Sequence, residues 1–144
     1  MKENKVDNSI HLISQIRKKI NDFLLQELKK IGLKKLVPSH GDIFAALYKH
    51  GELTMTEIAE KINRDRSTVT TLVKKLSKLG YVESKVDPED NRSNIIFLTP
   101  KGKKFKKDFK KISFKLHEIE YQGVSEEERK VFLKVLKKIN NNFS

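Results

Sequence analysis

The sequence predicts a mainly α-helical chain with one small β-hairpin, and three observations lead to this prediction. Apolar residues recur at steps of three and four through most of the 144 residues. Two short β-rich runs, 81–86 and 95–99, interrupt that pattern and are joined by a polar loop over 87–92. Glycine and proline separate the segments, and no internal repeat is visible.

The first half of the chain predicts three helices. Residues 9–31 carry an apolar stripe along one side and end at a glycine, which is typical of a long amphipathic helix. Pro38 opens a second helix, because proline fits the first helical position. A short third helix follows, where Thr54 and Glu57 have the spacing of a capping box and Thr56 is the other candidate cap.

The second half predicts three more helices around the hairpin. Asp65 caps a fourth helix, which Gly80 ends. A fifth helix begins at Lys101 and breaks at Gly123, and a sixth starts with the acid-rich segment 125–128. Four helices, a hairpin and two helices are the order of a winged helix-turn-helix with long N- and C-terminal helices.

Charge and composition narrow the class of partner. The formal net charge is +12, from 31 basic and 19 acidic residues, which favours nucleic acid or another anionic surface. Lysine outnumbers arginine 26 to 5, so a biased genome composition is an alternative source of the charge. The absence of cysteine excludes disulfides and thiolate chemistry within the chain. No signal peptide or membrane span is visible, and we expect a cytoplasmic, bacterial protein that binds no membrane.

The fourth helix has the composition of a DNA-reading helix. Its apolar stripe centres on Val69, Val73 and Leu76, and the opposite face carries hydroxyls and lysines. Hydroxyls and lysines contact bases and phosphates when such a helix lies in the major groove, and threonine methyls contact thymine. An ordinary surface helix is the alternative, although adjacent threonines are poor helix formers. The predicted DNA-binding residues of this helix are Arg66, Ser67, Thr68, Thr70, Thr71, Lys74 and Lys78.

The polar loop of the hairpin carries a second candidate contact. Arg92 is predicted at the hairpin tip, where an arginine can enter a narrow, electronegative minor groove, and Asn94 follows it. Asp90 would be repelled by phosphate, so we expect it to pair with Arg92 or to cap turn amides. Lys101, Lys103 and Lys104 come just after the hairpin and are candidate phosphate contacts.

These segments resemble the MarR (multiple-antibiotic-resistance regulator) family. The pair Asp90 and Arg92, the strand after them, and the pattern Leu98-Thr99-x-x-Gly102 are similar to the wing of that family, and the flanking helices match its layout. The resemblance implies an obligate homodimer that binds a pseudo-palindromic operator in double-stranded DNA. It also implies repression of transcription, relieved in many members by a small phenolic or other anionic effector.

The apolar stripes of the outer helices indicate a dimer independently of the resemblance. The first, fifth and sixth helices are too apolar on one side for a lone compact domain, and two copies can bury these sides mutually. Burial within one chain is the alternative. We therefore predict dimerisation helices over about 9–36 and 101–144, and a DNA-binding lobe over about 38–100. The expected seam consists of Ile13, Ile16, Ile20, Phe109, Ile112, Leu116, Phe132, Val135, Leu136 and Ile139.

The remaining motifs carry weaker predictions. Eight lysines between 101 and 115 are interpreted as the solvated side of a helix. The four histidines lack metal-ligand spacing, apart from a weak cluster near His117, and no nucleophile with a base or phosphate-binding loop is present, so we expect no cofactor, no metal and no enzyme activity. An effector pocket between dimer helices and lobe is expected to include His11, Phe44, Leu47, Tyr48 and Phe114.

The sequence thus predicts a homodimeric, ligand-responsive repressor of transcription. Three alternatives remain open: an activator or anti-repressor of the same fold, a metal-responsive or constitutive regulator, and a winged module that binds protein. The last is separated from the others by a strong salt dependence of DNA affinity, which only a DNA-binding protein shows.

Overall fold

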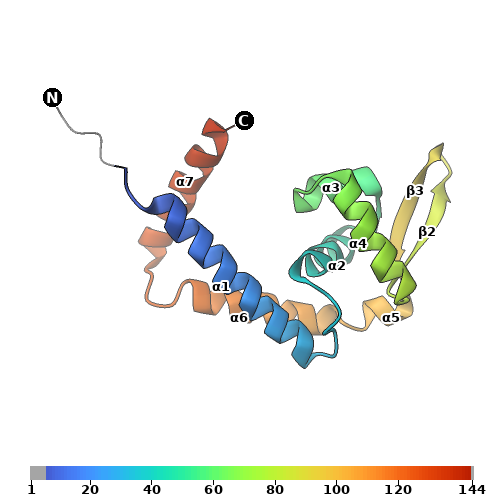
Figure 1. Cartoon of the computed structure of the whole chain (residues 1–144), viewed down its shortest axis with the longest axis horizontal. Coiled ribbons are helices and arrows are strands. Elements are labelled where there is room, and N and C mark those ends of the chain that lie inside the picture. Colours follow the sequence, from blue (N-terminus) through green and yellow to red (C-terminus); the bar gives the residue numbers. More distant parts are fainter. Residues whose placement is uncertain (1–5, 144) are drawn as a thin grey trace. The chain divides into compact units, whose positions relative to one another are not determined.

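The computed structural model describes residues 6–143 and confirms a mainly helical chain with a small antiparallel sheet (Figure 1). The chain divides into two compact units, one that ends at Lys110 and one that begins at Lys111. None of the helices in residues 6–143 is long and apolar enough to cross a lipid bilayer.

The first unit contains a helical lobe with a three-stranded sheet. In chain order its elements are α1 (Ser9–Lys30), α2 (Pro38–His50), β1 (Glu52–Thr54), α3 (Met55–Ile62), α4 (Arg66–Lys78), β2 (Val82–Asp87), β3 (Asp90–Leu98), α5 (Pro100–Lys103) and the first turn of α6 (Lys106–Glu120). The helices α2, α3 and α4 pack on one another and form the helix-turn-helix part of the lobe.

Local capping explains why the predicted start of α3 is correct. The Thr54 hydroxyl accepts from the Glu57 amide at 3.1 Å, and the Glu57 carboxylate accepts from the Thr54 amide at 3.0 Å, so both amides have partners where α3 begins. Asn63 ends α3 with a φ of +56°, a left-handed conformation that asparagine tolerates. The tight turn that follows leads directly into α4.

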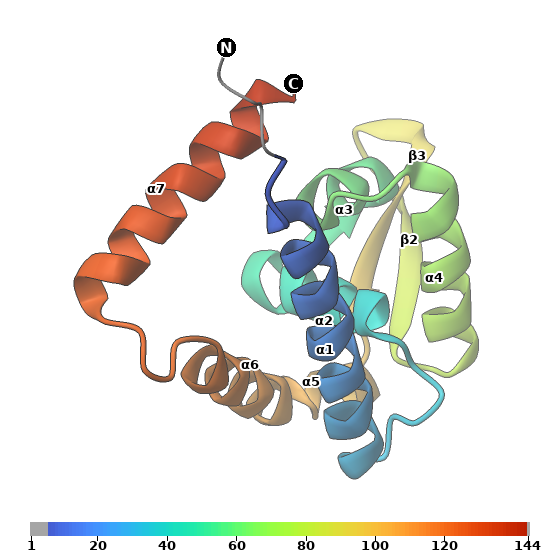
Figure 2. The same cartoon turned by 60° about the vertical axis from the view of Figure 1, so that its left-hand side comes forward.

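The sheet has the order β1-β3-β2, and all of its pairs are antiparallel. The strand β1 was not predicted, because three residues are too few to show an alternating pattern. It pairs with β3 such that Leu53 lies opposite Ile96, and both side chains enter the core. Figure 2 shows the β2–β3 hairpin beside α4, with which β2 is in contact.

Two predicted boundaries are wrong. The loop over 87–92 is a two-residue turn, Pro88 and Glu89, because β3 begins at Asp90 and pairs with Asp87. The single helix expected from Lys101 is two helices, α5 and α6, separated at Lys104 and Phe105. Contacts with the rest of the lobe fix the single turn of α5. The apolar periodicity of the sequence does not reveal these contacts, so the break between α5 and α6 was not predicted.

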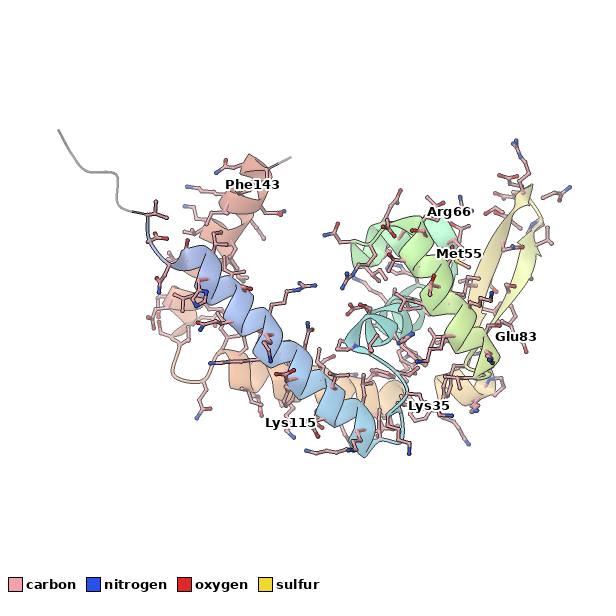
Figure 3. All side chains as sticks on the ribbon, in the orientation of Figure 1. Lys35, Met55, Arg66, Glu83, Lys115 and Phe143 are labelled. Atoms are coloured by element: carbon pink, nitrogen blue, oxygen red, sulfur yellow. The ribbon has the colours of Figure 1, made fainter. Side chains whose placement is uncertain are left out.

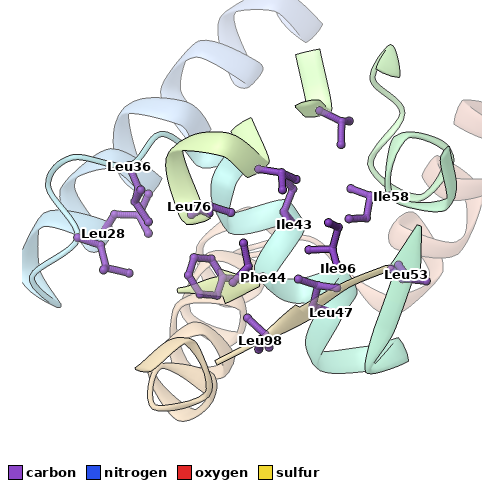
Figure 4. Packing of buried hydrophobic residues seen from close by; sticks show 14 residues of the cluster. Leu28, Leu36, Ile43, Phe44, Leu47, Leu53, Ile58, Leu76, Ile96 and Leu98 are labelled. Atoms are coloured by element: carbon purple, nitrogen blue, oxygen red, sulfur yellow. The ribbon is translucent and has the colours of Figure 1, made fainter. Parts of the chain in front are cut away.

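The core of the lobe is formed where the helices meet the inner face of the sheet (Figure 4). Phe44 on α2 is fully buried, and its ring stacks on that of Phe109 at 4.9 Å between centroids. The loop between α1 and α2 contributes two buried leucines to the same core. The buried cluster is made up of Leu28, Leu33, Leu36, Ile43, Phe44, Leu47, Leu53, Ile58, Val69, Val73, Leu76, Val82, Ile96 and Leu98.

The second unit contains the remainder of α6 and α7 (Glu126–Asn142). As predicted, the segment 125–128 starts α7, and Ser125 is its cap: the Ser125 hydroxyl accepts from the Glu128 amide at 3.1 Å, and the Glu128 carboxylate accepts from the Ser125 amide. Arg129 forms an ion pair with Glu126 at 2.6 Å in the first turn of α7 and lies over the Tyr121 ring. The cap, the ion pair and the contact with Tyr121 together fix the turn between α6 and α7.

Candidate nucleic-acid interface

Helix α4 begins with a carboxylate cap. The Asp65 carboxylate accepts from the Thr68 amide at 2.7 Å and from the Ser67 hydroxyl at 3.1 Å. Hydrogen bonds from Thr68 and Ser67 lower the pKa of Asp65, so the cap stays charged at neutral pH. Two of the predicted DNA-binding residues are thus donors to the cap. Ser67 donates to Asp65 through its hydroxyl, and Thr68 donates through its backbone amide.

The buried side of α4 is the predicted one, and it fixes which side faces outward. Val69, Val73 and Leu76 are almost fully buried in the lobe. Thr70 and Thr71 consequently lie on the exposed side, and their hydroxyls donate to the carbonyls of Arg66 and Ser67 at 2.9 and 3.2 Å. With the hydroxyl hydrogens used in this way, each threonine presents a methyl group and an oxygen lone pair to solvent.

A groove separates α4 from the hairpin, and it brings four of the predicted residues together. Its volume is about 480 Å³, and Thr70, Lys74 and Lys78 line it from α4 while Asn94 lines it from β3. Figure 3 places Arg66 at the N-terminal end of α4 and Glu83 at the base of the hairpin. The groove also contains residues that the sequence did not single out: Met55, Val73, Ser77, Val82, Glu83, Ser84 and Ile96.

The charges in this groove are mostly positive. Lys74 and Lys78 are exposed, and neither forms an ion pair within residues 6–143. Glu83 is the acidic residue of the groove lining. The groove is also lined by two serine hydroxyls and the Asn94 amide. Lysines, hydroxyls and amides are groups that contact the sugar–phosphate backbone of a nucleic acid.

The structure corrects the position of Arg92. It lies in β3, two residues after the strand begins, and not in a loop at the tip. Its side chain is 94% exposed, and its Nε lies 3.5 Å from the Asp90 carboxylate, which also accepts from the Arg92 amide at 3.0 Å. Asp87 accepts from the Glu89 amide in the same way, so two aspartates shape the turn while the guanidinium projects into solvent.

A cross-strand contact that the sequence did not reveal anchors the hairpin to the lobe. The Lys85 ammonium on β2 lies 2.9 Å from the Glu52 carboxylate on β1, and it passes over the Phe97 ring of β3 at 5.5 Å from the ring centroid. Because β3 lies between β1 and β2, this ion pair spans the whole width of the sheet. Only the register of β1, itself unpredicted, brings the two charges together.

Two exposed lysines, Lys75 on α4 and Lys101 on α5, donate to backbone carbonyls of the chain itself. Lys75 donates to the carbonyl of Lys35 in the loop between α1 and α2. Lys101 donates to the carbonyl of Leu79 at 2.8 Å, at the C-terminal end of α4. Lys101, Lys103 and Lys104 are all exposed, but the Lys101 ammonium already donates to this carbonyl, which disfavours the expected contact of Lys101 with phosphate.

The residues expected in an effector pocket occupy different environments. Phe44 and Leu47 belong to the buried core, His11 is exposed on α1, and Phe114 is exposed on α6. The Tyr48 hydroxyl donates to the carbonyl of Gly102 at 2.6 Å, and burial raises the pKa of Tyr48. Leu47 and Tyr48 border a hollow of about 390 Å³, which is also lined by Gly51, Glu52, Phe97, Leu98, Lys103 and Lys106.

The residues expected at the dimer seam also differ in exposure. Ile16 on α1 is 51% exposed and Val135 on α7 is 46% exposed. Phe109, in contrast, packs inside the lobe against Phe44 and Tyr48. The other large apolar side chains exposed on α1 and α7 are Ile10, Leu12, Ile13, Leu25, Val131, Phe132 and Ile139, and Phe143 is exposed just after α7.

The histidines are dispersed. No group of three potential ligands among histidine, aspartate and glutamate gathers within residues 6–143 in a way that would hold a metal ion. The His117 ring packs on the Tyr121 ring at 5.0 Å, and His40 is buried in the lobe.

Sequence comparisons agree with this geometry. The model of the MarR family matches residues 36–93, which include the helix-turn-helix and most of the hairpin. The transcriptional regulator SarZ of Staphylococcus haemolyticus is 31% identical over 102 residues, which are 70% of this chain and 68% of SarZ. The chain belongs to the MarR family.

The similarity to other members varies in extent. The regulator YdgJ of Bacillus subtilis is 30% identical over 103 residues, and the match spans 72% of this chain but only 63% of YdgJ. A solved MarR protein from Peptoclostridium difficile superposes with a TM-score of 0.86 and 21% identity, covering 99% of this chain and 92% of that protein. The fold of that MarR protein thus matches the outer helices of this chain as well as its helix-turn-helix and hairpin.

Proposed function

We propose that this MarR-family protein is a regulator of transcription that binds double-stranded DNA. The observation that carries the proposal is the exposed face of α4, where Thr70, Lys74 and Lys78 share a groove with Asn94 of the hairpin. In this arrangement α4 enters the major groove, and Arg92 reaches the adjacent minor groove. Such a protein acts on the chromosome in the cytoplasm and needs neither an active site nor a cofactor.

We further propose that the active form is a homodimer on a pseudo-palindromic operator. The apolar side chains that α1 and α7 leave exposed support this, because a soluble monomer rarely exposes so many large apolar groups on two helices. A second copy of the chain carries the same two surfaces and can cover them by two-fold symmetry. The two reading helices then lie in successive major grooves.

Repression controlled by a small effector is the form of regulation that we propose. BpsR of Bordetella bronchiseptica, whose DNA binding is regulated by 6-hydroxynicotinic acid, superposes on the chain with a TM-score of 0.80 and 19% identity. An aromatic acid of this kind, bound near the dimer helices, would favour a separation of the reading helices that does not fit the operator.

The test is a binding experiment on the upstream DNA of the protein's own gene. Footprinting defines the protected site, and fluorescence anisotropy then measures the affinity for it between about 50 and 200 mM salt, over which several phosphate contacts cost orders of magnitude in affinity. Affinity that does not change with salt, or no protection of any duplex, would refute the proposed function.

Arg92→Ala tests the wing within the same experiment. Loss of a groove contact is expected to weaken operator binding by about 1–3 kcal/mol. Lys137→Ala removes one positive charge from α7, outside the proposed interface, and should leave the affinity unchanged. Equal affinities of the Arg92 variant and the wild type would remove the wing from the interface.

A further inference from the structure

The end of the reading helix α4 is held by one short segment of the chain. The last carbonyls of α4 accept from the amides of residues 79–81, which close the helix. The next three carbonyls, those of Leu79, Gly80 and Tyr81, all accept hydrogen bonds from residues 99–101. Lys101 Nζ donates to Leu79 at 2.8 Å, the Thr99 hydroxyl donates to Gly80 at 2.6 Å, and the Thr99 amide donates to Tyr81 at 3.1 Å.

The same segment is fixed on its other side by Gly102. A Cβ atom on Gly102 would lie 2.2 Å from the Tyr81 carbonyl oxygen and 3.0 Å from a Leu98 methyl group, so only glycine allows this approach. The Gly102 carbonyl accepts from the Tyr48 hydroxyl of α2 at 2.6 Å. The turn α5 is thereby clamped between α2 and the corner where α4 passes into β2.

Lys101 is the charged member of this clamp. Its ammonium lies at the C-terminal end of α4, where the helix dipole is negative, and 4.9 Å from the centroid of the Tyr81 ring. Its side chain also runs past Gly80, where a Cβ atom on the glycine would lie 3.6 Å from Lys101 Cδ. All three lysines are exposed, but Lys74 and Lys78 line the groove of the interface and Lys101 does not.

We propose that Lys101 is a positioning residue that latches the C-terminal end of the reading helix to α5, rather than one of the lysines that contact phosphate. This rests on the proposed DNA-binding function, which it deepens. A loosened α4 would still be positively charged and would bind any duplex. It would lose the fixed orientation that fits base edges of the operator.

The latch also lies on the covalent path between the reading helix and α6. Only Lys104 and Phe105 separate α5 from α6, and the Phe105 ring contacts the Tyr81 ring edge-on at 5.8 Å. A shift of the first turn of α6 would therefore act on the same corner that Lys101 holds. The hydrogen bond of Lys101 therefore determines how much of a movement of the first turn of α6 reaches the C-terminal end of α4.

The experiment compares three substitutions at Lys101 with one at Lys104, the nearby exposed lysine. Lys101→Met keeps the apolar stem and removes the donor, Lys101→Gln keeps a donor without charge, and Lys101→Arg keeps both. Affinity is measured by anisotropy for the footprinted operator and for a scrambled duplex of equal length, over a salt series. Thermal unfolding verifies that each variant is folded at the temperature of the measurement.

For Lys101→Met we expect about tenfold weaker operator binding, unchanged binding to the scrambled duplex, and an unchanged slope of log affinity against log salt. Lys101→Arg should restore most of the affinity, and Lys104→Met should leave the preference for the operator intact. If Lys101→Met is unfolded, Lys101→Gln takes its place in the test, and its operator binding should be weaker with the same unchanged slope.

Two outcomes would overturn the latch. One is an equal loss on both duplexes with a slope shallower by about 0.9, which is the result for a phosphate contact. The other is unchanged operator affinity in Lys101→Met. Failure of the wild type to bind any duplex would instead refute the proposed function, so the two failures are distinguishable.

Discussion

At the scale of single residues, hydrogen bonds decide what the interface offers to DNA. The sequence shows that Thr70 and Thr71 lie on the polar side of a helix. It does not show that both hydroxyls donate to carbonyls one turn earlier, since the geometry of the folded helix determines that choice. A contact of these residues with thymine methyl groups is consequently favoured over donation to a base.

The ionisation of His40 is coupled to folding. The Val37 amide donates to its Nδ1 at 2.9 Å, and its Nε2 is buried without a partner among the described residues. Burial, and secondarily the positive charge of Lys75, lower the pKa of His40 to about 4. The folded protein therefore keeps this histidine neutral at neutral pH.

We predict that His40 makes the protein less stable in acid. The unfolded chain binds a proton on this histidine below pH 6.5, and the folded chain only below about 4. Stability is therefore complete above pH 6.5 and falls towards pH 4, by about 2–3 kcal/mol from this group. Urea unfolding at pH 7.5 and 4.5 measures the loss.

His40→Gln is the matched control for this prediction. Glutamine at the third position of a helix can still accept from the Val37 amide but does not titrate. Carboxylates that titrate in the same range contribute equally to both proteins and cancel in the comparison. If wild type and His40→Gln lose the same stability between the two pH values, His40 is not responsible.

At the scale of elements, two neighbouring lysines on α4 are predicted to act differently. Lys74 is exposed in the groove beside the hairpin, whereas Lys75 donates to the carbonyl of Lys35. Lys74→Ala should lower the slope of log affinity against log salt by about 0.9, since one phosphate contact is lost. Lys75→Ala should leave the slope unchanged. Equal slopes for the two variants would contradict this division of the helix.

Helix starts could be predicted from the sequence, because the caps are local. Thr54 with Glu57, Asp65 with Thr68, and Ser125 with Glu128 each lie within three residues, so the pattern contains the whole interaction. The apolar side of α4 was predicted correctly for a related reason, since a helical period fixes the buried face. The fold class follows from these features, whereas the resemblance to the MarR family rests on the wing pattern of Asp90, Arg92 and Leu98-Thr99-x-x-Gly102.

Other elements could not be predicted, because distant residues determine them. The strand β1 exists through its pairing with β3, more than 40 residues later. The turn α5 depends on carbonyls at the end of α4 and on the Tyr48 hydroxyl. The same holds for the candidate site. The exposed face of α4 was predicted, but the hydrogen bonds of Lys75 and Lys101 to backbone carbonyls were not, because these carbonyls lie far away in the sequence.

At the scale of the whole molecule, the net charge is +12, but the lysines that contribute to it have different interaction partners. Lys75 and Lys101 bond to carbonyls, Lys85 pairs with Glu52, and Lys74 and Lys78 remain exposed at the groove. A count of positive charges therefore overstates the number of phosphate contacts. The salt dependence of the affinity measures the smaller number directly.

The final prediction concerns self-association through α7. Val135 is 46% exposed, so Val135→Lys should disturb little inside one chain, but in a dimer that covers this side of α7 it buries an unpaired ammonium in each copy. Sedimentation equilibrium should give twice 16.8 kDa for the wild type and a single or unfolded chain for the variant. Asn140→Lys adds the same charge farther along α7 and roughly 140° around the helix, and it should remain dimeric. A Val135→Lys protein that keeps the mass and melting temperature of the wild type would show that this side of α7 is not covered by a second copy.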